Sequence, residues 1–477
     1  MDPSYMLVDT HAHLYSMEFD KDIEEVLGRA EDAGVGYIIC PGTDLETSRR
    51  SIELAERYPV IYAAVGIHPH DASKADSSAF DELEELSRHP KVVAVGEIGL
   101  DYHYNYSPPE IQKEIFSRQI TIAQRRNLPV IIHSREAEED VIKILQTRMK
   151  DDPKWRSESV HPASRYPSPK GVFHCFPGNS KMAWKVIEIG FYISLTGPLT
   201  YGDKPNKPNI MAEVAKNVSA EHILLETDSP YLAPVPFRGK RNEPSYIRYI
   251  ADKIASLQGL FVEDVARAST FGAHKLFKVG AYPAPTIAYK LRNSLYLNIT
   301  IRCNADCVFC DRKGDAIIKG HNLRITNEPS VQQIIESIGD PLRYDEIVFC
   351  GYGEPTIRLE VLKEVSKWIK SRGGKVRLNT DGHGNIINNR NIVPELAGLV
   401  DAISISLNAT DPAQYGFMMQ IDGKRFFPAM VDFARECVKH NFDVTMTIVD
   451  IEGVDDSKAR EFVEKEIGAK FKKRPFF

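Results

Sequence analysis

The sequence predicts an α/β protein that consists of a (β/α)₈ barrel followed by a second, smaller α/β domain. Its 477 residues exceed the length of one ordinary domain, so two domains with separate cores are expected. Eight short apolar runs alternate with helical patterns over the first 280 residues, and six more such runs follow a proline-containing stretch. This alternation favours strands joined by helices in both parts of the chain.

The first domain is expected to contain eight strands with helices between them. We expect these strands at residues 6–10, 35–40, 61–66, 92–97, 129–133, 171–174, 191–195 and 222–227. The segment after the first strand shows the helical pattern, because Ile23, Val26 and Ala30 fall on one face at helical spacing. Eight apolar strands separated by helices indicate a (β/α)₈, or TIM, barrel.

A short linker containing Pro283 and Pro285 follows the last expected barrel helix. We therefore divide the chain into a barrel at residues 1–280, a linker at 281–290 and a second domain at 291–477. The expected strands of the second domain are residues 294–301, 345–352, 375–380, 401–407, 443–449 and 469–477. Six strands are too few to close a complete barrel.

The composition is that of a globular protein with a slight excess of acidic residues. The formal net charge is −6, so the chain does not read as a basic nucleic-acid clamp. No run of about 18 apolar residues suggests a membrane span, and the N-terminal residues lack a signal-peptide pattern. With seven cysteines and no such signal, we expect a reducing, cytoplasmic location and no membrane partner.

Histidine and acidic residues recur at the ends of the expected barrel strands. They are His11 and His13 at the first strand, His68 at the third, Glu97 at the fourth, His133 at the fifth, His174 at the sixth and Asp228 at the eighth. Barrel enzymes build their sites at the C-terminal ends of the strands, so these side chains should converge on one mouth. Four of these imidazoles together with the two carboxylates suit two divalent ions that activate a water and stabilise the oxygens of a displacement.

Three of these residues are expected to have distinct roles. Glu97 is the best candidate to bridge two ions because its strand is central. Asp228 could bind one ion and also take the proton from the attacking water. His68 is expected to contact the substrate instead of a metal ion.

Six motifs make the first domain resemble the TatD family of metal-dependent deoxyribonucleases. In chain order they are DTHAHL, GIHPH, GEIGLDYH, VIIHSR, GVFHCFPG and LLETDSPYLAP, at residues 9–14, 66–70, 96–103, 130–135, 171–178 and 224–234. The resemblance covers residues 5–278 and implies a divalent-metal phosphodiesterase, often a 3′-to-5′ exonuclease, with DNA or another nucleic acid or nucleotide as substrate. It also implies that two ions (Mg, Mn or Zn) are held by His11, His13, Glu97, His133, His174 and Asp228.

The first loop of the second domain carries Cys303, Cys307 and Cys310, spaced as Cys-x-x-x-Cys-x-x-Cys. Three thiolates on one short loop can hold three irons of a four-iron, four-sulfur cluster and leave the fourth iron open for chemistry. A zinc site is a weaker interpretation, because no partner pair of ligands follows in the sequence. A disulfide framework fits a reducing compartment less well still.

Phe309, directly before the third cysteine, makes this loop resemble the radical SAM superfamily. The superfamily's glycine-rich motif, which contacts the methionine amino group, is matched by Gly351, Gly353, Glu354 and Pro355. The match departs from the common form at Tyr352, which replaces a glycine. The resemblance covers about residues 290–477 and implies a partial (β/α)₆ barrel whose open iron binds S-adenosylmethionine. One-electron reduction, by a donor of the flavodoxin or ferredoxin type, would then yield a 5′-deoxyadenosyl radical.

The leading interpretation is a bifunctional enzyme, in which a phosphodiester hydrolase is fused to a radical SAM enzyme of unknown substrate. One alternative keeps the hydrolase but changes its substrate to a small amide or an aminoacyl ester, since similar barrels serve many hydrolyses. A second alternative makes the C-terminal domain an iron–sulfur redox sensor that catalyses no reaction. An anaerobic test for 5′-deoxyadenosine separates the sensor from the enzyme.

Overall fold

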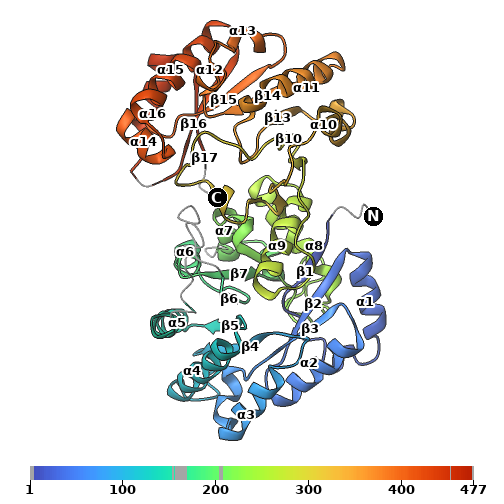
Figure 1. Ribbon diagram of the computed structural model, residues 1–477. Helices are drawn as coiled ribbons and strands as arrows, with labels where there is room; N and C mark the ends of the chain where they lie inside the picture. The colour runs from blue at the N-terminus through green and yellow to red at the C-terminus, as the bar shows by residue number, and fades with distance from the viewer. Residues whose placement is uncertain (1–4, 153–154, 156–168, 204–207, 452, 475–477) are drawn as a thin grey trace. The chain divides into compact units, whose positions relative to one another are not determined.

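The computed structural model describes residues 5–152, 155, 169–203, 208–451 and 453–474. The chain forms two compact units that separate between Pro283 and Ala284. Figure 1 labels most of the helices and strands of both units, numbered in chain order. Of the helices described, none combines the length and the apolar character that crossing a membrane requires.

The first unit is built around one eight-stranded parallel sheet whose strands are neighbours in chain order. Its strands are β1 (Leu7–Asp9), β2 (Val35–Pro41), β3 (Ile61–Val65), β4 (Val92–Asp101), β5 (Val130–Arg135), β6 (Gly171–Phe173), β7 (Phe191–Leu195) and β8 (Ile223–Leu225). Just beyond β1, the amide of Thr10 donates to the carbonyl of Leu225 over 3.0 Å. The amide of Asp228 donates to the carbonyl of His11 over 2.9 Å. The first and last strands therefore meet, and the predicted TIM barrel is confirmed.

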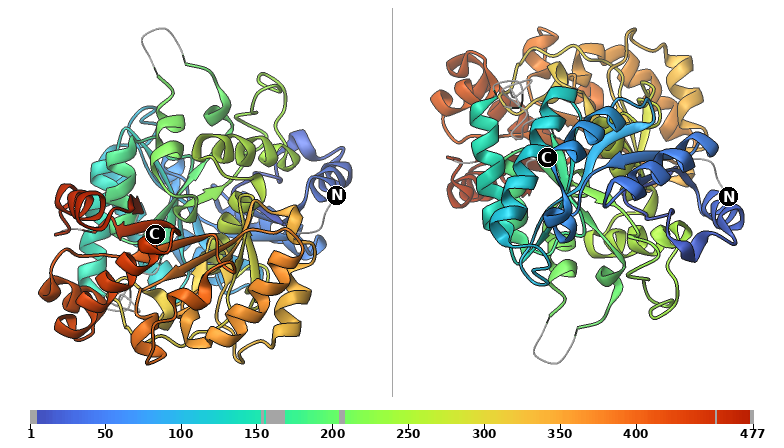
Figure 2. Two further views of the ribbon diagram at one scale, coloured as in Figure 1. Left: turned by 90° about the horizontal axis from the view of Figure 1, so that it is seen from above. Right: turned by 90° about the horizontal axis from the view of Figure 1, so that it is seen from below.

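Helices surround these strands on the outside, as Figure 2 (right) shows. They are α1 (Ile23–Asp32), α2 (Leu45–Arg57), α3 (Ser77–Leu86), α4 (Pro109–Arg126), α5 (Glu138–Asp151), α6 (Ser180–Glu188), α7 (Ile210–Asn217), α8 (Ile247–Gln258) and α9 (Val262–Phe277), with short turns η1 (Met17–Phe19), η2 (Pro69–Lys74), η3 (Gly197–Thr200), η4 (Ala220–His222) and η5 (Pro244–Tyr246). Side chains satisfy the free amides at several helix starts. Asp44 accepts from the amide of Thr47 over 2.8 Å, and Asn179 accepts from that of Met182 over 3.0 Å.

Apolar side chains fill both faces of the barrel strands. One cluster packs between strands and outer helices and contains the fully buried Ile38, Ile132 and Phe173. A second cluster joins alternate strand residues, such as Val8 and Ile39, to α9. Because both faces are covered, the strands read in the sequence as continuous apolar runs, which is why they could be predicted.

The second unit contains a seven-stranded sheet with the order β17-β16-β15-β14-β13-β10-β9. Its strands are β9 (Ala288–Leu291), β10 (Ser294–Leu297), β13 (Glu346–Phe349), β14 (Val376–Thr380), β15 (Ala402–Ser406), β16 (Asp443–Val449) and β17 (Lys470–Arg474). From β10 to β17 every neighbouring pair in this sheet is parallel. A separate two-stranded sheet pairs β11 (Ile317–Ile318) with β12 (His321–Asn322). These six parallel strands agree with the predicted partial barrel.

Helices also connect the parallel strands of the second unit. They are α10 (Val331–Ile338), α11 (Leu359–Ser371), α12 (Gly384–Ile387), α13 (Val393–Leu396), α14 (Pro412–Met419), α15 (Gly423–Lys439) and α16 (Asp456–Glu461), with turns η6 (Asp311–Lys313), η7 (Pro341–Arg343), η8 (Pro355–Arg358) and η9 (Phe462–Ile467). The core beneath them includes Phe349, Leu378, Ile403 and Phe433, all fully buried. This unit therefore has a hydrophobic core of its own.

Two details differ from the sequence-based expectation. Strand β4 does not end at Glu97 but continues to Asp101, so that Glu97 lies inside the strand. The end of the expected linker, residues 281–290, overlaps strand β9, which pairs antiparallel with β10. Strand β9 was not predicted because no glycine marks the tight turn that joins it to β10. In this turn Arg292 adopts the positive φ of 53° that glycine usually provides.

Gly99 in β4 lets the backbone of β5 lie close to the backbone of β4. Its φ is +148°, and a Cβ placed there would lie 1.9 Å from the carbonyl oxygen of His133. We expect Gly99→Ala to lower the free energy of unfolding of this domain by about 2–6 kcal/mol, from backbone strain together with overpacking. Thermal denaturation measures this change. The matched control is Gly28→Ala in the exposed face of α1, where no atom lies within 4 Å and a gain of about 1 kcal/mol is expected. Equal stability of the two variants would contradict this role of Gly99.

Candidate metal centre and cysteine loop

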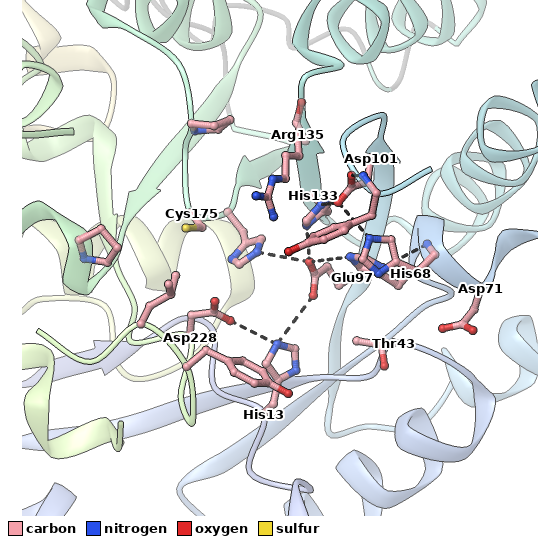
Figure 3. Close-up of a pocket in the computed structure, with 18 of the residues that line it drawn as sticks. His13, Thr43, His68, Asp71, Glu97, Asp101, His133, Arg135, Cys175 and Asp228 are labelled. Atoms are coloured by element: carbon pink, nitrogen blue, oxygen red, sulfur yellow. Dashed lines mark hydrogen bonds and ion pairs between the residues drawn. The ribbon is translucent and has the colours of Figure 1, made fainter. Parts of the chain in front are cut away.

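The histidines and acids singled out in the first domain come together at one mouth of the barrel. His11 and His13 follow β1, Glu97 lies in β4 and His133 in β5, while His174 and Asp228 follow β6 and β8. His13, Glu97, His133, His174 and Asp228 line a cavity of about 740 Å³, drawn in Figure 3. That volume is within the range of small-molecule and cofactor sites.

Glu97 occupies the centre of this group and is only 3% exposed. Its Oε2 lies 3.4 Å from Nε2 of His11 and 3.8 Å from Nε2 of His13. Its Oε1 lies 2.9 Å from Nδ1 of His133 and 3.3 Å from Nε2 of His174. The two oxygens of one carboxylate thus face two different pairs of imidazoles.

Asp228 completes the side of the site formed by His11 and His13. Its Oδ1 lies 3.3 Å from Nε2 of His13 and 3.8 Å from Nε2 of His11. The residue has a left-handed backbone, with φ of 57°. This conformation is uncommon for a residue other than glycine, and it could not be anticipated from the sequence.

Three groups of donor atoms converge within 4.8 Å among the described residues. They are His11, His13 and Asp228; His11, His174 and Glu226; and His68, Glu97 and His133. From the sequence we expected His68 to contact the substrate, but its Nε2 lies 3.4 Å from Oε1 of Glu97. His68 therefore sits close enough to the carboxylate to contact either a metal ion or a ligand bound there.

A second layer of side chains orients these histidines, and sequence reasoning missed it. Nε2 of His133 lies 3.0 Å from Oδ2 of Asp101, and Nδ1 of His174 lies 3.2 Å from Oε1 of Glu226. Such carboxylate–histidine pairs are typical of metal sites, because they fix the ring and raise its basicity. Asp101 lies in GEIGLDYH and Glu226 in LLETDSPYLAP, so their place at strand ends was the available signal.

One further contact and two further buried atoms belong to this layer. The hydroxyl of Tyr15 lies 3.0 Å from Nδ1 of His13. Nδ1 of His11 and Oε2 of Glu226 are buried without a hydrogen-bond partner among the described residues. Buried polar atoms normally have partners, so these two atoms indicate that the site is completed by something beyond the protein chain.

The charges at the site suit a divalent cation. Burial opposes ionisation of Glu97, but the imidazole of His174 and the hydrogen bonds with His11 and His133 hold the pKa of its carboxyl well below the usual value. Burial likewise opposes charge on Asp228, while the hydrogen bond from His13 lowers its pKa. Burial lowers the pKa of His68 to about 4, which leaves that ring neutral at pH 7. The site therefore combines ionised carboxylates, which raise the pKa of His13, His133 and His174 against the effect of burial, with a neutral ring at His68.

Glu226 is expected to support metal binding without being a primary ligand. We expect Glu226→Gln to weaken the binding of a divalent ion by about 10- to 100-fold. A neutral amide orients the ring of His174 less firmly than a carboxylate does, and it raises the basicity of that ring less. Competition of Mn²⁺ or Zn²⁺ against a chelator measures the change. Glu188→Gln, on an exposed position of α6, should leave the affinity unaltered. An unchanged affinity in Glu226→Gln would remove this residue from the site.

In the second domain, the cysteine loop follows β10 and is anchored to helix α14. The amides of Asp306 and Val308 donate to the carbonyls of Met419 and Met418 over 3.1 and 2.9 Å. All three cysteines are free and partly buried. Burial raises the pKa of the Cys303 thiol to about 12 and that of Cys307 well above its usual value. Thiols held in this way need a bound cation to become thiolates.

The glycine-rich turn after β13 packs directly against this loop region. A Cβ at Gly353 would lie 2.3 Å from the carbonyl oxygen of Thr300, so only glycine fits. The carboxylate of Glu354 accepts from the hydroxyl of Thr380 over 2.9 Å and from the amide of Asp381 over 2.8 Å. Burial, with Asp381 nearby, raises the pKa of Glu354 to about 8. Pro355 begins turn η8, and Phe309 packs against the domain core.

The chain matches the models of two protein families. The model described as TatD related DNase matches residues 8–278, which is more than half of the chain. The model of the radical SAM superfamily matches residues 297–465. Each match falls within one of the two compact units.

Three similar proteins all match the first domain. An uncharacterized metal-dependent hydrolase of Bacillus subtilis, YabD, is 43% identical over 274 residues, which cover 57% of this chain and all of that protein. The 3′-5′ ssDNA/RNA exonuclease TatD of Salmonella typhimurium is 32% identical over 277 residues, covering 57% of this chain and 99% of that protein. The crystal structure of YJJV, a TatD homolog from Escherichia coli K12, has a TM-score of 0.51 and 32% identity, covering 57% of this chain and 98% of that chain.

Proposed function

We propose, because the chain belongs to the family of TatD related DNases, that its barrel hydrolyses phosphodiester bonds in nucleic acid from a strand end. The chain carries a TatD-type metal-dependent hydrolase domain and a radical SAM domain. The observation that best supports the proposal is the arrangement around Glu97, whose two oxygens face two pairs of imidazoles. A central carboxylate of this kind suits a pair of ions.

The proposed division of ligands follows these distances. His11, His13 and Asp228 would hold one ion, His133 and His174 the other, and Glu97 both. Two bound divalent ions would supply an activated water and stabilise the oxygens of the displaced phosphodiester. An oxygen of Asp228, which is ionised at neutral pH, would accept the proton of the attacking water. His68, neutral at that pH, would position a phosphate oxygen or complete the second set of ligands.

The nucleic-acid substrate is supported by relatives that are named as 3′-5′ exonucleases of single-stranded DNA and RNA. Purified protein should be supplied with Mg²⁺, Mn²⁺ or Zn²⁺ and incubated with end-labelled single-stranded DNA, RNA and duplex DNA. A parallel series contains small amides and aminoacyl esters. Product ladders from one end would support exonucleolytic hydrolysis, whereas turnover of amides or esters with inert nucleic acid would overturn it.

For the second domain we propose a radical SAM enzyme rather than a sensor. Cys303, Cys307 and Cys310 would hold three irons of a four-iron, four-sulfur cluster, and the turn at Gly351, Gly353, Glu354 and Pro355, together with Phe309, would contact S-adenosylmethionine. The bound cluster and cofactor would supply a 5′-deoxyadenosyl radical once a flavodoxin- or ferredoxin-type donor provides an electron. The seven free cysteines suit the reducing cytoplasm.

The test of this proposal is anaerobic. Protein reconstituted with iron and sulfide is reduced with dithionite in the presence of S-adenosylmethionine, and 5′-deoxyadenosine is quantified. Formation of 5′-deoxyadenosine supports an enzyme. A cluster that binds the cofactor and is reduced without cleaving it would instead favour a redox sensor.

A further inference from the structure

Two tyrosines stand exposed at the rim of the metal cavity, on the loop that follows β4. Tyr104 is 47% exposed and Tyr106 is 67% exposed. Their rings are almost parallel, with an interplanar angle of 5° and centroids 5.5 Å apart. Large aromatic side chains normally bury most of their surface, so a stacked pair left open to solvent calls for a partner.

The packing contacts of these rings do not account for their position. Each ring meets His70 by an edge, at 5.5 Å for Tyr104 and 4.8 Å for Tyr106. His70 is itself held by Asp101, whose Oδ2 lies 3.0 Å from its Nε2. Fixing His70 therefore does not require two exposed phenol rings. A purely structural role would predict burial of the rings in the core, which neither shows.

The loop is held in register with the metal site by one carboxylate. Oδ1 of Asp101 accepts from the amides of His103 and Tyr104, each over 3.0 Å. Oδ2 of the same residue contacts Nε2 of His133 over 3.0 Å. The aromatic pair is thus fixed at a set position relative to a histidine of the proposed metal centre, as a group that places substrate must be.

Arg135 adds a positive charge next to the rings. Its guanidinium lies 4.7 Å from the centroid of the Tyr104 ring, and its side chain points into the cavity in Figure 3. It is the only lysine or arginine among the described residues that line this cavity. In the described part of the chain, no carboxylate lies within ion-pair distance of it. A cation beside an aromatic face, with no carboxylate partner, suits a phosphate next to a stacked base.

We propose that Tyr104 and Tyr106 form a stacking ledge for the base of a nucleotide at the single-stranded end of a nucleic acid, with Arg135 binding a phosphate of the same strand. This inference rests on the proposed nuclease function and names the residues that select its substrate. Stacking on a ring needs an unpaired base, so the ledge favours a single strand over a duplex. Because every base has a π-face, the ledge is expected to tolerate all four bases.

The test compares two single-stranded oligonucleotides that differ only by the absence of two bases. One is intact, and the other has abasic nucleotides on both sides of the first bond that the wild-type protein cleaves. We expect the double variant Tyr104→Ala/Tyr106→Ala to lose about 5- to 150-fold in kcat/KM on the intact strand, mainly through KM. On the abasic strand it should match the wild type. Tyr106→Trp should keep the preference for the intact strand, because the ring is retained.

Tyr249→Ala removes an exposed tyrosine of α8 outside the cavity and serves as the matched control, with no change expected on either strand. A double variant that retains the wild-type preference for the intact strand overturns the ledge but leaves the nuclease function standing. If the wild-type protein neither cleaves nor, in fluorescence anisotropy, binds either strand, the nuclease function itself fails and the ledge with it. Circular dichroism of each variant excludes misfolding as the cause of a loss.

Discussion

Glu97→Gln is expected to reduce hydrolysis of nucleic acid by about 10³-fold or more, the largest effect of any single change in the barrel. Glutamine has the shape of glutamate but offers one oxygen instead of two, and its amide nitrogen cannot bind a cation. Since Oε1 and Oε2 of Glu97 face different pairs of imidazoles, the change breaks the connection between the two sets of ligands. Initial rates on a labelled single strand at saturating Mn²⁺ measure the loss.

Metal content distinguishes loss of bridging from general damage. We expect the wild-type barrel to bind two ions and Glu97→Gln to bind at most one with comparable affinity. Glu188→Gln, with its side chain exposed on α6, should retain both ions and full activity. Glu97→Gln should also keep the iron and the visible absorbance of the second domain, because the two domains have separate hydrophobic cores. Two tightly bound ions and more than a tenth of the activity in Glu97→Gln would show that Glu97 does not bridge.

The strands of both domains were predictable for a physical reason. In the barrel, residues such as Val8 and Ile39 pack in one cluster with α9, while Ile38 and Ile132 pack in another cluster with the other helices, so each strand appears as an unbroken apolar run. Strand β9 was missed because its signal is of another kind. Among the described strands it pairs with β10 alone, at the edge of the sheet, and no glycine marks the turn between them.

The sequence predicted at which end of the barrel the residues of the candidate site lie, but not which side chains they contact. His133 and His174 stand at strand ends, and the barrel fold alone brings such residues to one mouth. Their partners Asp101 and Glu226 stand there too, yet nothing in the sequence tells which acid faces a metal ion and which faces a histidine. That choice depends on side-chain direction, as does the position of Tyr104 at the rim, and it becomes visible only when the strands are placed side by side.

In the second domain the largest expected effect comes from Cys307→Ala. It should abolish the iron–sulfur cluster and reduce formation of 5′-deoxyadenosine by at least about 100-fold. Cys307 is the middle cysteine of the loop, and its Sγ lies 3.5 Å from the sulfur of the buried Met419. Without it only Cys303 and Cys310 remain on the loop, and two thiolates do not hold a four-iron cluster. Iron and sulfide analysis, visible absorbance and the dithionite assay measure the effect, while hydrolysis by the barrel should stay within about twofold.

The choice of control decides how this result is read. Cys437→Ala also removes a thiol of the same domain, but Cys437 is fully buried in α15 and is not part of the cysteine loop. It leaves a small cavity of the kind that lowers stability by about 1–2 kcal/mol, and it should keep the cluster. Loss of the cluster in both variants would mean that general destabilisation removes it. If the anaerobically purified wild-type protein contains zinc in place of iron and sulfide, the proposed iron–sulfur cluster is wrong. A closed zinc site has no open position for S-adenosylmethionine.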